Sequence, residues 1–569
     1  MILGKSLSKR RSLLILFAFS LLSSSPGLGD NSSLFGQEAG GPDQAEIAIQ
    51  GVAEAPATKG WDEKIDEAFK PIADWFGALI FYTAPIMGKD IPIVVIVLVV
   101  GALFFTLFFG LINIRLFPLA IRIVSGKYDD LDDEGNSETT SNDASDSSED
   151  HHGEVSHFQA LATAVSGTVG LGNIAGVAVA IAVGGPGATF WMIICGLLGM
   201  STKFVECTLG VKYRDIDENG VVHGGPMYYL RKGLQGMGLG WLGGLLAIVF
   251  AILCVGGSLG GGNAFQANQA TAQISSLLNL NSDSAGTIIG IIMAILVGIV
   301  IIGGIKRIAK ITEKIVPLMA GIYIIAALII IIMNIAHVPQ AIGQIFSGAF
   351  TPAAGFGGII GVLIVGFKRA AFSNEAGAGS AAIAHSAVRT KYPASEGLVA
   401  LLEPFIDTVV ICTMTAIVII LFNIPGAGDQ PQFAYGDVES NQVLIDGDRV
   451  GGVGLTSEAF DSVLPGFRYV LTIAIILFAF STMISWSYYG LQSWKFLFGR
   501  SQLADLSYKL LFLAFIVIGS AASLGSVLDF SDAMILGLVF PNMLGLLLLF
   551  PKVREELSRY LIAIKNRNK

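Results

Sequence analysis

The stretch "SGTVGLGN", from Ser166 to Asn173, places three glycines within six residues in the middle of a long apolar run. The run, residues 158–182, is long enough to cross a bilayer as a helix. Glycine is a poor helix former, and unpaired backbone polar groups are costly in hydrocarbon, so a break at this depth must be surrounded by protein or line a water-filled cavity. The stretch therefore predicts a broken membrane helix.

The chain as a whole has the composition of a helical membrane protein. Of its 569 residues, 53% are hydrophobic and only 14% are charged. Apolar runs of about 18–25 residues recur along it, whereas an outer-membrane barrel would show alternating segments of about ten residues. We predict an all-α membrane protein with eleven spans, at residues 91–113, 158–182, 187–209, 241–272, 285–303, 311–335, 354–386, 398–423, 465–494, 506–526 and 531–550.

Basic residues indicate the direction of these spans. Lys and Arg fill every second connection, as at Arg115, Arg122 and Lys127, whereas the connections between them hold only Arg449. Cytoplasmic loops carry the excess of Lys and Arg, so the first span starts outside and the C-terminus is cytoplasmic. The net charge of −9 comes largely from two polar stretches. No basic patch and no nucleotide-binding motif point to nucleic acid or a nucleotide as partner.

The two ends of the chain and its polar stretches complete the predicted organisation. Basic residues precede a short apolar run within the first thirty residues, which predicts a signal peptide; an uncleaved anchor is the alternative. The four cysteines lie in apolar segments, and we interpret them as core residues. The predicted parts are a signal peptide at 1–30, an extracytoplasmic lead-in at 31–90, an extra transmembrane helix at 91–113, an acidic cytoplasmic loop at 128–157, a first five-helix repeat at 158–335, a second at 354–550 with an extracytoplasmic insertion at 424–464, and a basic cytoplasmic tail at 551–569.

Ten of the spans divide into two groups of five that enter the membrane from opposite sides. Each group opens with a glycine-interrupted span, "SGTVGLGNIAG" in the first and "GFGGIIGVLIVGFKRAAFSNEAGAG" in the second. Paired broken helices at matched positions are typical of inverted repeats with a binding site near the bilayer midplane. The alternative is that the glycines only let helices pack closely. Two clusters at matched positions favour the binding site.

The first break offers ligands for both a cation and an anion. A half-helix ending near Val165 would present free carbonyls, and one beginning near Asn173 would present free N–H groups to the same gap. Its glycines would take positive φ and let the backbone approach a ligand, while Ser166 and Thr168 add hydroxyls. Hard oxygen ligands without thiol or imidazole suit Na⁺. The break can therefore hold a sodium ion beside a carboxylate.

Five motifs resemble the alanine or glycine:cation symporter family, which has the LeuT-like architecture of the amino acid-polyamine-cation superfamily. They are "ALATAVSGTVGLGNIAG", "GGPGATFWM" (184–192), "HGGPMYYL" (223–230), "FSNEAGAGSAAIAH" (372–385) and "FSTMISWSYYG" (480–490). The resemblance covers about residues 75–555, with departures at Thr189, at Ile193 and in the long segment 424–464. It implies a LeuT-like 5+5 inverted repeat with one extra N-terminal helix.

The resemblance also implies ligands in the first break, because "VGLGN" is similar to the broken-helix motif of neurotransmitter:sodium symporters. The backbone amides of Gly170, Leu171 and Gly172 would hold the substrate carboxylate. Asn173 and the carbonyl of Thr168 would bind a sodium ion that the carboxylate also touches.

A second sodium site and a side-chain pocket follow from the same resemblance. The second sodium would take ligands from Ser166, Val169, Phe478, Ser481 and Thr482. Hydroxyls in membrane helices often bond the preceding turn instead, which is the alternative for the last two. Gln266, Phe367 and Trp486 resemble pocket residues. Gln266 would bond the carboxylate, and the two rings would close over a small side chain, with core packing as their alternative role.

Charged residues in apolar spans are functional candidates by default. The acidic ones are Glu206, Glu375, Glu403 and Asp407. Three of them are expected near the cytoplasmic face, in a gate or structural ion pair rather than in proton coupling. Lys368 and Arg369 are expected on the inner side of the second break, facing the cytoplasmic vestibule.

These patterns favour a secondary transporter over a channel or an enzyme, since no continuous polar lining and no nucleophile or metal constellation is visible. The resemblance implies a sodium-coupled symporter that imports small neutral amino acids, alanine or glycine, by alternating access. Its partners would be the amino acid, Na⁺ as coupling ion and the lipid bilayer of a prokaryotic inner membrane. A proton-coupled or broader-specificity amino-acid carrier is the alternative. No enzymatic activity is expected.

Overall fold

The computed structural model describes most of the chain from residue 60 onward. The described ranges are 60–86, 89–133, 153–280, 282–302, 304–350, 358–426, 430–436 and 441–568. The predicted signal peptide at 1–30 therefore lies outside the described residues, as do half of the lead-in and most of the acidic loop at 128–157.

The described chain is mostly helical, which confirms the predicted all-α class. The helices of the leading span and first group are α3 (Ile93–Phe108), α7 (His157–Thr168), η1 (Gly172–Gly176), α8 (Val177–Gly184), α9 (Gly187–Lys212), α11 (Gly240–Leu259), η2 (Gly260–Ala264), α12 (Phe265–Leu278), α13 (Ala285–Ile301) and α14 (Gly304–Met333). Those of the second group are α16 (Gly358–Asn374), α17 (Ala382–His385), α18 (Pro393–Val399), α19 (Leu402–Pro404), η3 (Phe405–Cys412), α20 (Thr413–Phe422), α22 (Phe467–Phe498), α23 (Gln502–Ala521), α24 (Leu524–Gly537) and α25 (Val539–Arg567).

Seven helical segments among the described residues are long and apolar enough to cross a membrane, or eight if the bent pair α7 and α8 forms one span. Two shorter apolar helices, α3 and α13, add to these. Helix α16 is also short, with 17 residues, and carries Lys368 and Arg369. Exposed isoleucines such as Ile288, Ile295 and Ile299 cover the outer surface of α13. Such an apolar surface requires a bilayer rather than water around it.

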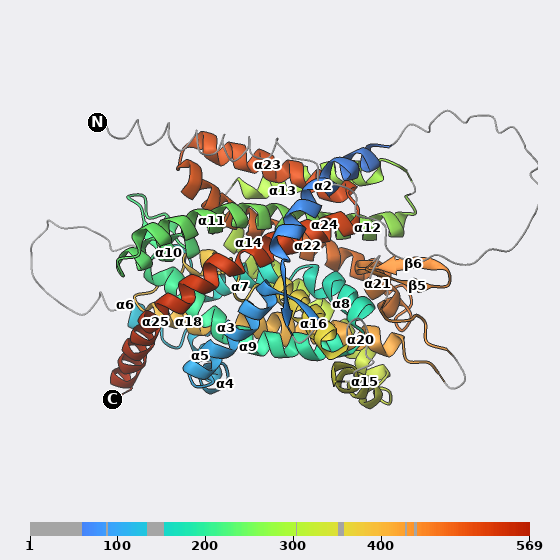
Figure 1. Ribbon diagram of the computed structural model, residues 1–569, viewed down its shortest axis with the longest axis horizontal. Helices are drawn as coiled ribbons and strands as arrows, with labels where there is room; N and C mark the ends of the chain where they lie inside the picture. Colours follow the sequence, from blue (N-terminus) through green and yellow to red (C-terminus); the bar gives the residue numbers. More distant parts are fainter. Residues whose placement is uncertain are drawn as a thin grey trace, which may run out of the picture. The chain divides into compact units, whose positions relative to one another are not determined.

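The two helix groups pack in a reciprocal way, and α7 and α16 lie in the middle of the bundle (Figure 1). Helix α7 packs against α14, the last helix of its own group, and α16 packs against α24, in the last span of its group. Helix α9 of the first group packs against α16, while η3 of the second group packs against η1. This exchange is what two repeats related by a two-fold axis imply. The boundaries 158–335 and 354–550 stay predictions.

The other described elements pack around these helices. They are α2 (Trp61–Ile80), α4 (Ile112–Arg115), α5 (Phe117–Val124), α6 (Asp130–Asp133), α10 (Pro226–Gln235), α15 (Val338–Phe350), α21 (Val453–Asp461) and three two-stranded antiparallel sheets made of β1 (Thr83–Ile86) with β2 (Lys89–Pro92), β3 (Asp215–Ile216) with β4 (Val222–His223), and β5 (Gln442–Ile445) with β6 (Asp448–Gly451). Asp62 of α2 caps α13, because its carboxylate accepts the backbone N–H of Gly286 at 3.0 Å and of Thr287 at 3.1 Å.

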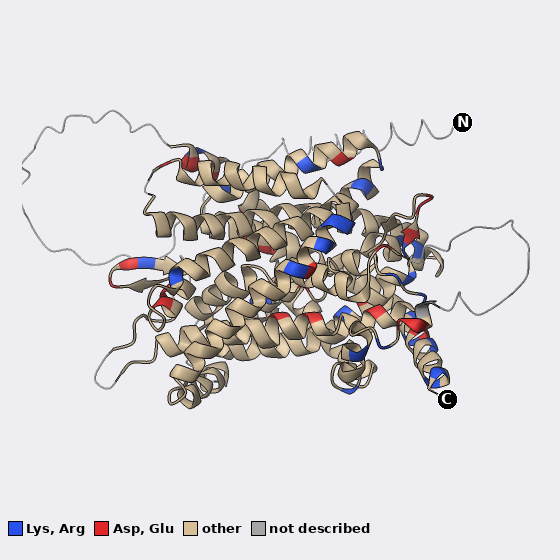
Figure 2. Ribbon diagram, turned by 180° about the vertical axis from the view of Figure 1, so that it is seen from behind, with Lys and Arg blue, Asp and Glu red and all other residues tan. Residues whose placement is uncertain are grey.

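Helix α21, within the predicted insertion at 424–464, packs against η1, which follows the first break. The Thr456 hydroxyl on α21 donates to the carbonyl of Ile174 in η1 at 3.2 Å. The end of α21 is tied to the start of α22, where Arg468 donates to Asp461 at 2.8 Å and keeps the pKa of that carboxyl below its ordinary value. At the other end of the chain, α25 continues as a helix through the predicted tail, with acidic and basic residues along its last turns (Figure 2).

Candidate functional site

The predicted break in the first span is present, and it is short. Helix α7 opens with a capping box in which Ser156 and Gln159 exchange side-chain and backbone hydrogen bonds. It ends at Thr168, and η1 begins at Gly172 after a bend of 51°. The helix therefore runs three residues beyond the expected end at Val165, and only residues 169–171 are non-helical.

The glycines of this break do not take positive φ, so that expectation was wrong. Instead, the absence of a side chain at these glycines lets a neighbouring helix approach closely. A Cβ at Gly170 would lie 2.4 Å from Oγ1 of Thr482, and one at Gly167 would lie 2.9 Å from the hydroxyl of Tyr489. At Gly176, one turn later, a Cβ would meet nothing within 4 Å. Two of these glycines thus bring α7 against α22, where any side chain would separate the two helices.

Two oxygens assigned to the first sodium converge in the structure. The amide N–H of Gly170 is within 2.9 Å of the Thr168 carbonyl and within 2.9 Å of Oδ1 of Asn173. Asn173 is fully buried, and its Nδ2 donates to Oδ1 of Asp407 at 2.6 Å. The other carboxylate oxygen of Asp407 accepts from the hydroxyl of Ser373 at 2.9 Å. Asn173 therefore links polar groups of α7 and η1 on one side to those of η3 and α16 on the other.

Asp407 is a site residue whose place the sequence did not reveal. We expected it in a gate or ion pair; it instead faces Asn173, Ser373 and its neighbour Thr408, whose hydroxyl donates to it at 2.7 Å. Its burial in the apolar run of η3 was the available signal, because an ionisable residue at membrane depth marks a functional site.

Of the amides assigned to the substrate carboxylate, that of Leu171 bonds Gln266, whereas that of Gly170 is already bonded to Asn173 and to the Thr168 carbonyl. The N–H of Leu171 donates to Oε1 of Gln266 at 2.9 Å, while Nε2 of that side chain donates to the carbonyl of Gly261 at 2.9 Å. The carboxamide oxygen occupies the position that a carboxylate oxygen would take on Leu171. A Cβ at Gly172 would be 3.5 Å from the Phe372 ring, so the third of these residues packs against α16.

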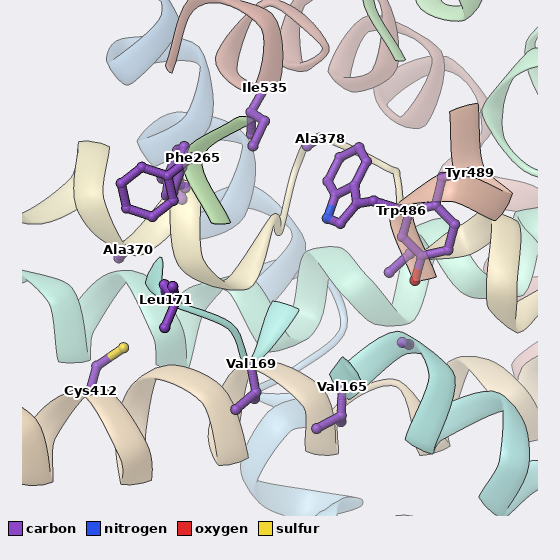
Figure 3. Close-up of a cluster of buried hydrophobic side chains, with 14 of the residues drawn as sticks. Val165, Val169, Leu171, Phe265, Ala370, Ala378, Cys412, Trp486, Tyr489 and Ile535 are labelled. Carbon is purple, nitrogen blue, oxygen red and sulfur yellow. The ribbon is translucent and has the colours of Figure 1, made fainter. Parts of the chain in front are cut away.

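The residues assigned to a second sodium join α7 to α22. The Ser166 hydroxyl donates to the Ser481 carbonyl at 2.8 Å, and the Thr482 hydroxyl donates to the Ser166 carbonyl at 2.9 Å. The Ser481 hydroxyl bonds the Phe478 carbonyl of the preceding turn at 3.0 Å, which is the alternative considered above. Val169 is buried in the break that follows α7 (Figure 3).

The second break lies between α16 and α17, and three of its residues have positive φ: Glu375 at 56°, Gly377 at 94° and Gly379 at 83°. Trp486, 1% exposed, reaches it from α22: its Nε1 is 3.0 Å from Oε1 of Glu375 and 3.2 Å from the carbonyl of Gly167. Figure 3 shows Trp486 beside Tyr489, at a ring-centroid distance of 5.2 Å. Trp486 thus contacts the second break and the last turn of α7, just before the first break.

Of the two assigned rings, only Trp486 has such contacts. Phe367 is buried on α16 and its ring is 6.4 Å from that of Trp191 on α9. Phe372, five residues later, approaches Gly172, and its ring would be 3.2 Å from a Cβ at Gly261. Sequence similarity assigned Phe367 to the substrate pocket, whereas the contacts in the structure favour Phe372 as a pocket residue.

The placement of Lys368 and Arg369 corrects the sequence prediction. Both precede the second break, on α16, and pair with Asp532 of α24, Lys368 at 2.9 Å and Arg369 in closer contact. Under the predicted topology this is the outer side of the break, not the inner side. The chain leaves the helix at Glu375, where positive φ begins, rather than at the earlier glycines of the span.

A buried chain of charged residues follows the second break. Glu396 accepts from His157 and from His385, the latter at 2.5 Å. His385 also contacts Glu403 at 3.4 Å, and Glu403 pairs with Lys203 at 3.0 Å. All but His157 are fully buried. Because the partners come from α7, α9, α17, α18 and α19, this ion network holds together the elements next to the two breaks.

Comparison with known proteins identifies the family of this chain. Residues 77–569 match the model of the sodium:alanine symporter family. The sodium/alanine symporter AgcS of Methanococcus maripaludis is 38% identical over 482 residues, which cover 84% of this chain and 96% of that protein. The amino-acid carrier protein AlsT of Bacillus subtilis is 35% identical, covering 76% of this chain and 81% of its own.

Among solved structures, MhsT in complex with L-phenylalanine covers 70% of this chain and 99% of its own, at a TM-score of 0.44 and 14% identity. The family match spans the two breaks, their surrounding helices and the whole second group. This multi-pass membrane protein belongs to the sodium:alanine symporter family.

Proposed function

We propose that the protein is a sodium-coupled symporter that imports small neutral amino acids, alanine and glycine, across the inner membrane of a prokaryote. The observation that carries the proposal is the first break, where hard oxygen ligands adjoin a backbone N–H that already binds the carboxamide oxygen of Gln266. Transport would proceed by alternating access, with the C-terminus in the cytoplasm. The membership in a transporter family supports transport rather than catalysis.

Sodium would be bound by the Thr168 carbonyl and by Oδ1 of Asn173, both of which accept from the N–H of Gly170 in this structure and would have to release it. The carboxylate of Asp407, 2.6 Å from the Asn173 amide, supplies the negative charge that a desolvated cation needs. All of these ligands are hard oxygens, which suit Na⁺. Ser166 and Thr482 support a second sodium between α7 and α22.

The substrate carboxylate would bind the N–H of Leu171 in place of the Gln266 oxygen. It would then lie two residues from Asn173, close enough to share a sodium ion with it. A ligand that completes the coordination of the ion raises the affinity for that ion, and the ion raises the affinity for the ligand by the same factor. This reciprocity is the physical basis of coupled transport.

Small substrates fit the close packing around the breaks. A Cβ at Gly262 would come within 2.1 Å of the Trp486 ring, and one at Gly261 within 2.3 Å of Ile535. Neither backbone nor a tryptophan ring in such contact can move away at little cost. A large side chain would therefore have to displace packed groups.

A proton-coupled carrier is the second candidate, and buried Asp407 favours it. A carboxyl beside Asn173 and Ser373 can carry a proton instead of balancing a sodium ion. The two candidates differ in the gradient that drives uptake.

The test is uptake of labelled alanine by proteoliposomes containing the purified protein. An inward Na⁺ gradient should accumulate alanine, and potassium in its place should not. Accumulation driven by a proton gradient without sodium would favour the second candidate. Counterflow of alanine against preloaded unlabelled alanine separates a carrier from a channel, since a channel shows none.

A further inference from the structure

An exposed segment that follows α3 combines apolar and basic side chains and has no part in the proposed function. After α3 the chain reverses at Gly110 and Leu111, which have φ of 63° and 55°, and continues as α4 and α5. Ile114 and Ile121, seven residues apart, are 68% and 49% exposed. Helical residues at this spacing lie on the same side, so the two isoleucines share one outer face. Such a face is better covered by hydrocarbon than by water.

The same face carries positive charge. Arg115 and Arg122 directly follow the two isoleucines in sequence, Lys127 comes soon after, and all three are exposed. No acidic residue occurs between Asp90 and Asp129. Within the described part of the chain, none of the three basic side chains forms an ion pair or a hydrogen bond. Uncompensated positive charge therefore lies beside an apolar surface.

Helix α25 adds a further basic residue at the end of α3. The guanidinium of Arg554 is 5.7 Å from the centroid of the Phe108 ring, which packs edge-on against Phe550 at 4.5 Å. Arg115 turns back to the same place, since its Nη1 is 3.2 Å from the position that a Cβ at Gly110 would take. Guanidinium groups from two separate elements thus lie at the end of one apolar helix.

The segment is fixed to the bundle on its other side. Nδ2 of Asn113 donates to the Leu197 carbonyl of α9 at 2.8 Å, and the Phe117 ring is 4.9 Å from the Phe405 ring of η3. Helix α5 also packs against α18 (Figure 1). The exposed face is therefore in place before a ligand arrives, which lowers the entropy cost of binding.

A partner for this face must combine negative charge with apolar surface. A second copy of the same face would bring like charges together, and a small soluble anion would leave the isoleucines in water. An anionic phospholipid meets both requirements, because its phosphate accepts from guanidinium groups and its acyl chains cover apolar side chains.

We propose that the exposed face of residues 111–127, together with Arg554, is a binding site for an anionic phospholipid. The phosphate would accept from Arg115 and Arg554, and the acyl chains would lie along Ile114 and the exposed side of α3. Arg122 and Lys127 would add attraction to the anionic membrane surface. Under the predicted topology this is the cytoplasmic leaflet. The proposal does not depend on which ion or amino acid is transported.

The test compares lipids that differ only in the headgroup. Fluorescently labelled phosphatidylglycerol is bound to the purified full-length protein in a non-ionic detergent. It is then competed with unlabelled phosphatidylglycerol, with phosphatidylcholine of the same acyl chains, or with glycerol 3-phosphate. Phosphatidylglycerol should compete at least about tenfold better than phosphatidylcholine, because two or more basic residues favour the anionic headgroup and each contributes about fivefold. Glycerol 3-phosphate, which has no acyl chains, should compete poorly.

The double variant Arg115→Gln/Arg554→Gln should weaken phosphatidylglycerol by at least about tenfold and leave phosphatidylcholine unchanged, for the same reason. Both residues are exposed, so the fold should tolerate the change. Arg115→Lys/Arg554→Lys keeps the charges and should retain most of the preference for the anionic lipid.

Lys552→Gln/Arg567→Gln is the matched control on α25. It also removes two positive charges, but these are already paired, Lys552 with Glu555 at 3.2 Å and Arg567 with Asp130 at 2.6 Å. This variant should keep the wild-type preference. An equal loss in both double variants would show that overall charge, and not this face, attracts the lipid, and would overturn the proposal.

Three other results would also overturn the proposal. Equal competition by the two lipids on the wild type would leave the face to another occupant, such as the acidic stretch at 134–152 of this chain. Competition by glycerol 3-phosphate as strong as by phosphatidylglycerol would indicate a site for a soluble phosphate. An unchanged preference in Arg115→Gln/Arg554→Gln would place the lipid elsewhere on the protein.

Discussion

The two broken helices at the centre of the protein differ in backbone conformation and in the groups that they present. In the first, the chain stays right-handed, and glycines allow close contact with α22. In the second, three residues have a left-handed backbone conformation, and one of them, Glu375, carries a carboxylate. The first break thus presents backbone groups and neutral side chains to a ligand, and the second presents charge. Similar glycine-rich sequences can therefore encode backbone access in one helix and a change of direction in another.

The largest effect is expected from filling the first break. In Gly170→Ala the new methyl would lie 2.4 Å from Oγ1 of Thr482 and 3.0 Å from Oε1 of Gln266. The contact between α7 and α22 would have to open, so sodium-driven alanine uptake should be lost.

Gly176→Ala is the control within the same segment, because a Cβ there meets nothing within 4 Å. It should transport alanine at close to the wild-type rate. Equal loss in both variants, measured as initial uptake by proteoliposomes, would mean that glycine at this break serves flexibility and not close approach.

Removing one charge of the buried ion pair near the second break should lower the free energy of unfolding. Lys203 and Glu403 are both fully buried, so Lys203→Met leaves the Glu403 carboxylate with only the longer contact to His385, at a cost of about 3–5 kcal/mol in the free energy of unfolding. Thermal unfolding in detergent should show a large decrease in midpoint.

The exposed pair of Lys552 and Glu555 provides the comparison, since Lys552→Met removes an ion pair that water already solvates. The midpoint of thermal unfolding of Lys552→Met should be close to that of the wild type. If Lys203→Met were equally mild, the buried ion network would not hold α9 to α19.

A smaller, specific effect is expected at Asn173. Because its Oδ1 faces the proposed sodium and the ion touches the carboxylate, Asn173→Ala should weaken Na⁺ and alanine together, each by about tenfold. Isothermal binding of alanine across a range of sodium concentrations measures both. A variant that binds alanine normally but has lost its sodium dependence would exclude a shared site.

The smallest effect concerns which rings limit substrate size. Trp486→Ala and Phe367→Ala are each predicted to admit larger apolar amino acids, and one methylene is worth about 1–3 kcal/mol. Since Phe372 approaches Gly172 and Gly261, Phe372→Ala should change the ranking of glycine, alanine and leucine more than Phe367→Ala does. The opposite order in a competition assay would place the pocket nearer to Trp191.

The sequence predicted the parts of this site that repeat along the chain or follow a motif. Hydropathy located the helices, and the run Ser166 to Asn173 located the first break to within a few residues. No sequence pattern predicts contacts between segments that are far apart in the chain. Asn173 and Asp407 are 234 residues apart, and His157 and Glu396 are 239 apart. The second break was misjudged for Lys368 and Arg369 because glycines occur throughout that span, and only backbone φ shows which of them turn the chain.

The most direct test of a shared sodium and substrate site is the reciprocal effect of sodium and alanine on each other's binding to the wild-type protein. The alanine dissociation constant is measured at increasing Na⁺, and the Na⁺ dissociation constant at increasing alanine. Shared ligands in the first break predict that both fall by the same factor, at least about tenfold. Alanine affinity that is independent of sodium, with potassium as the balancing ion, would contradict a common site.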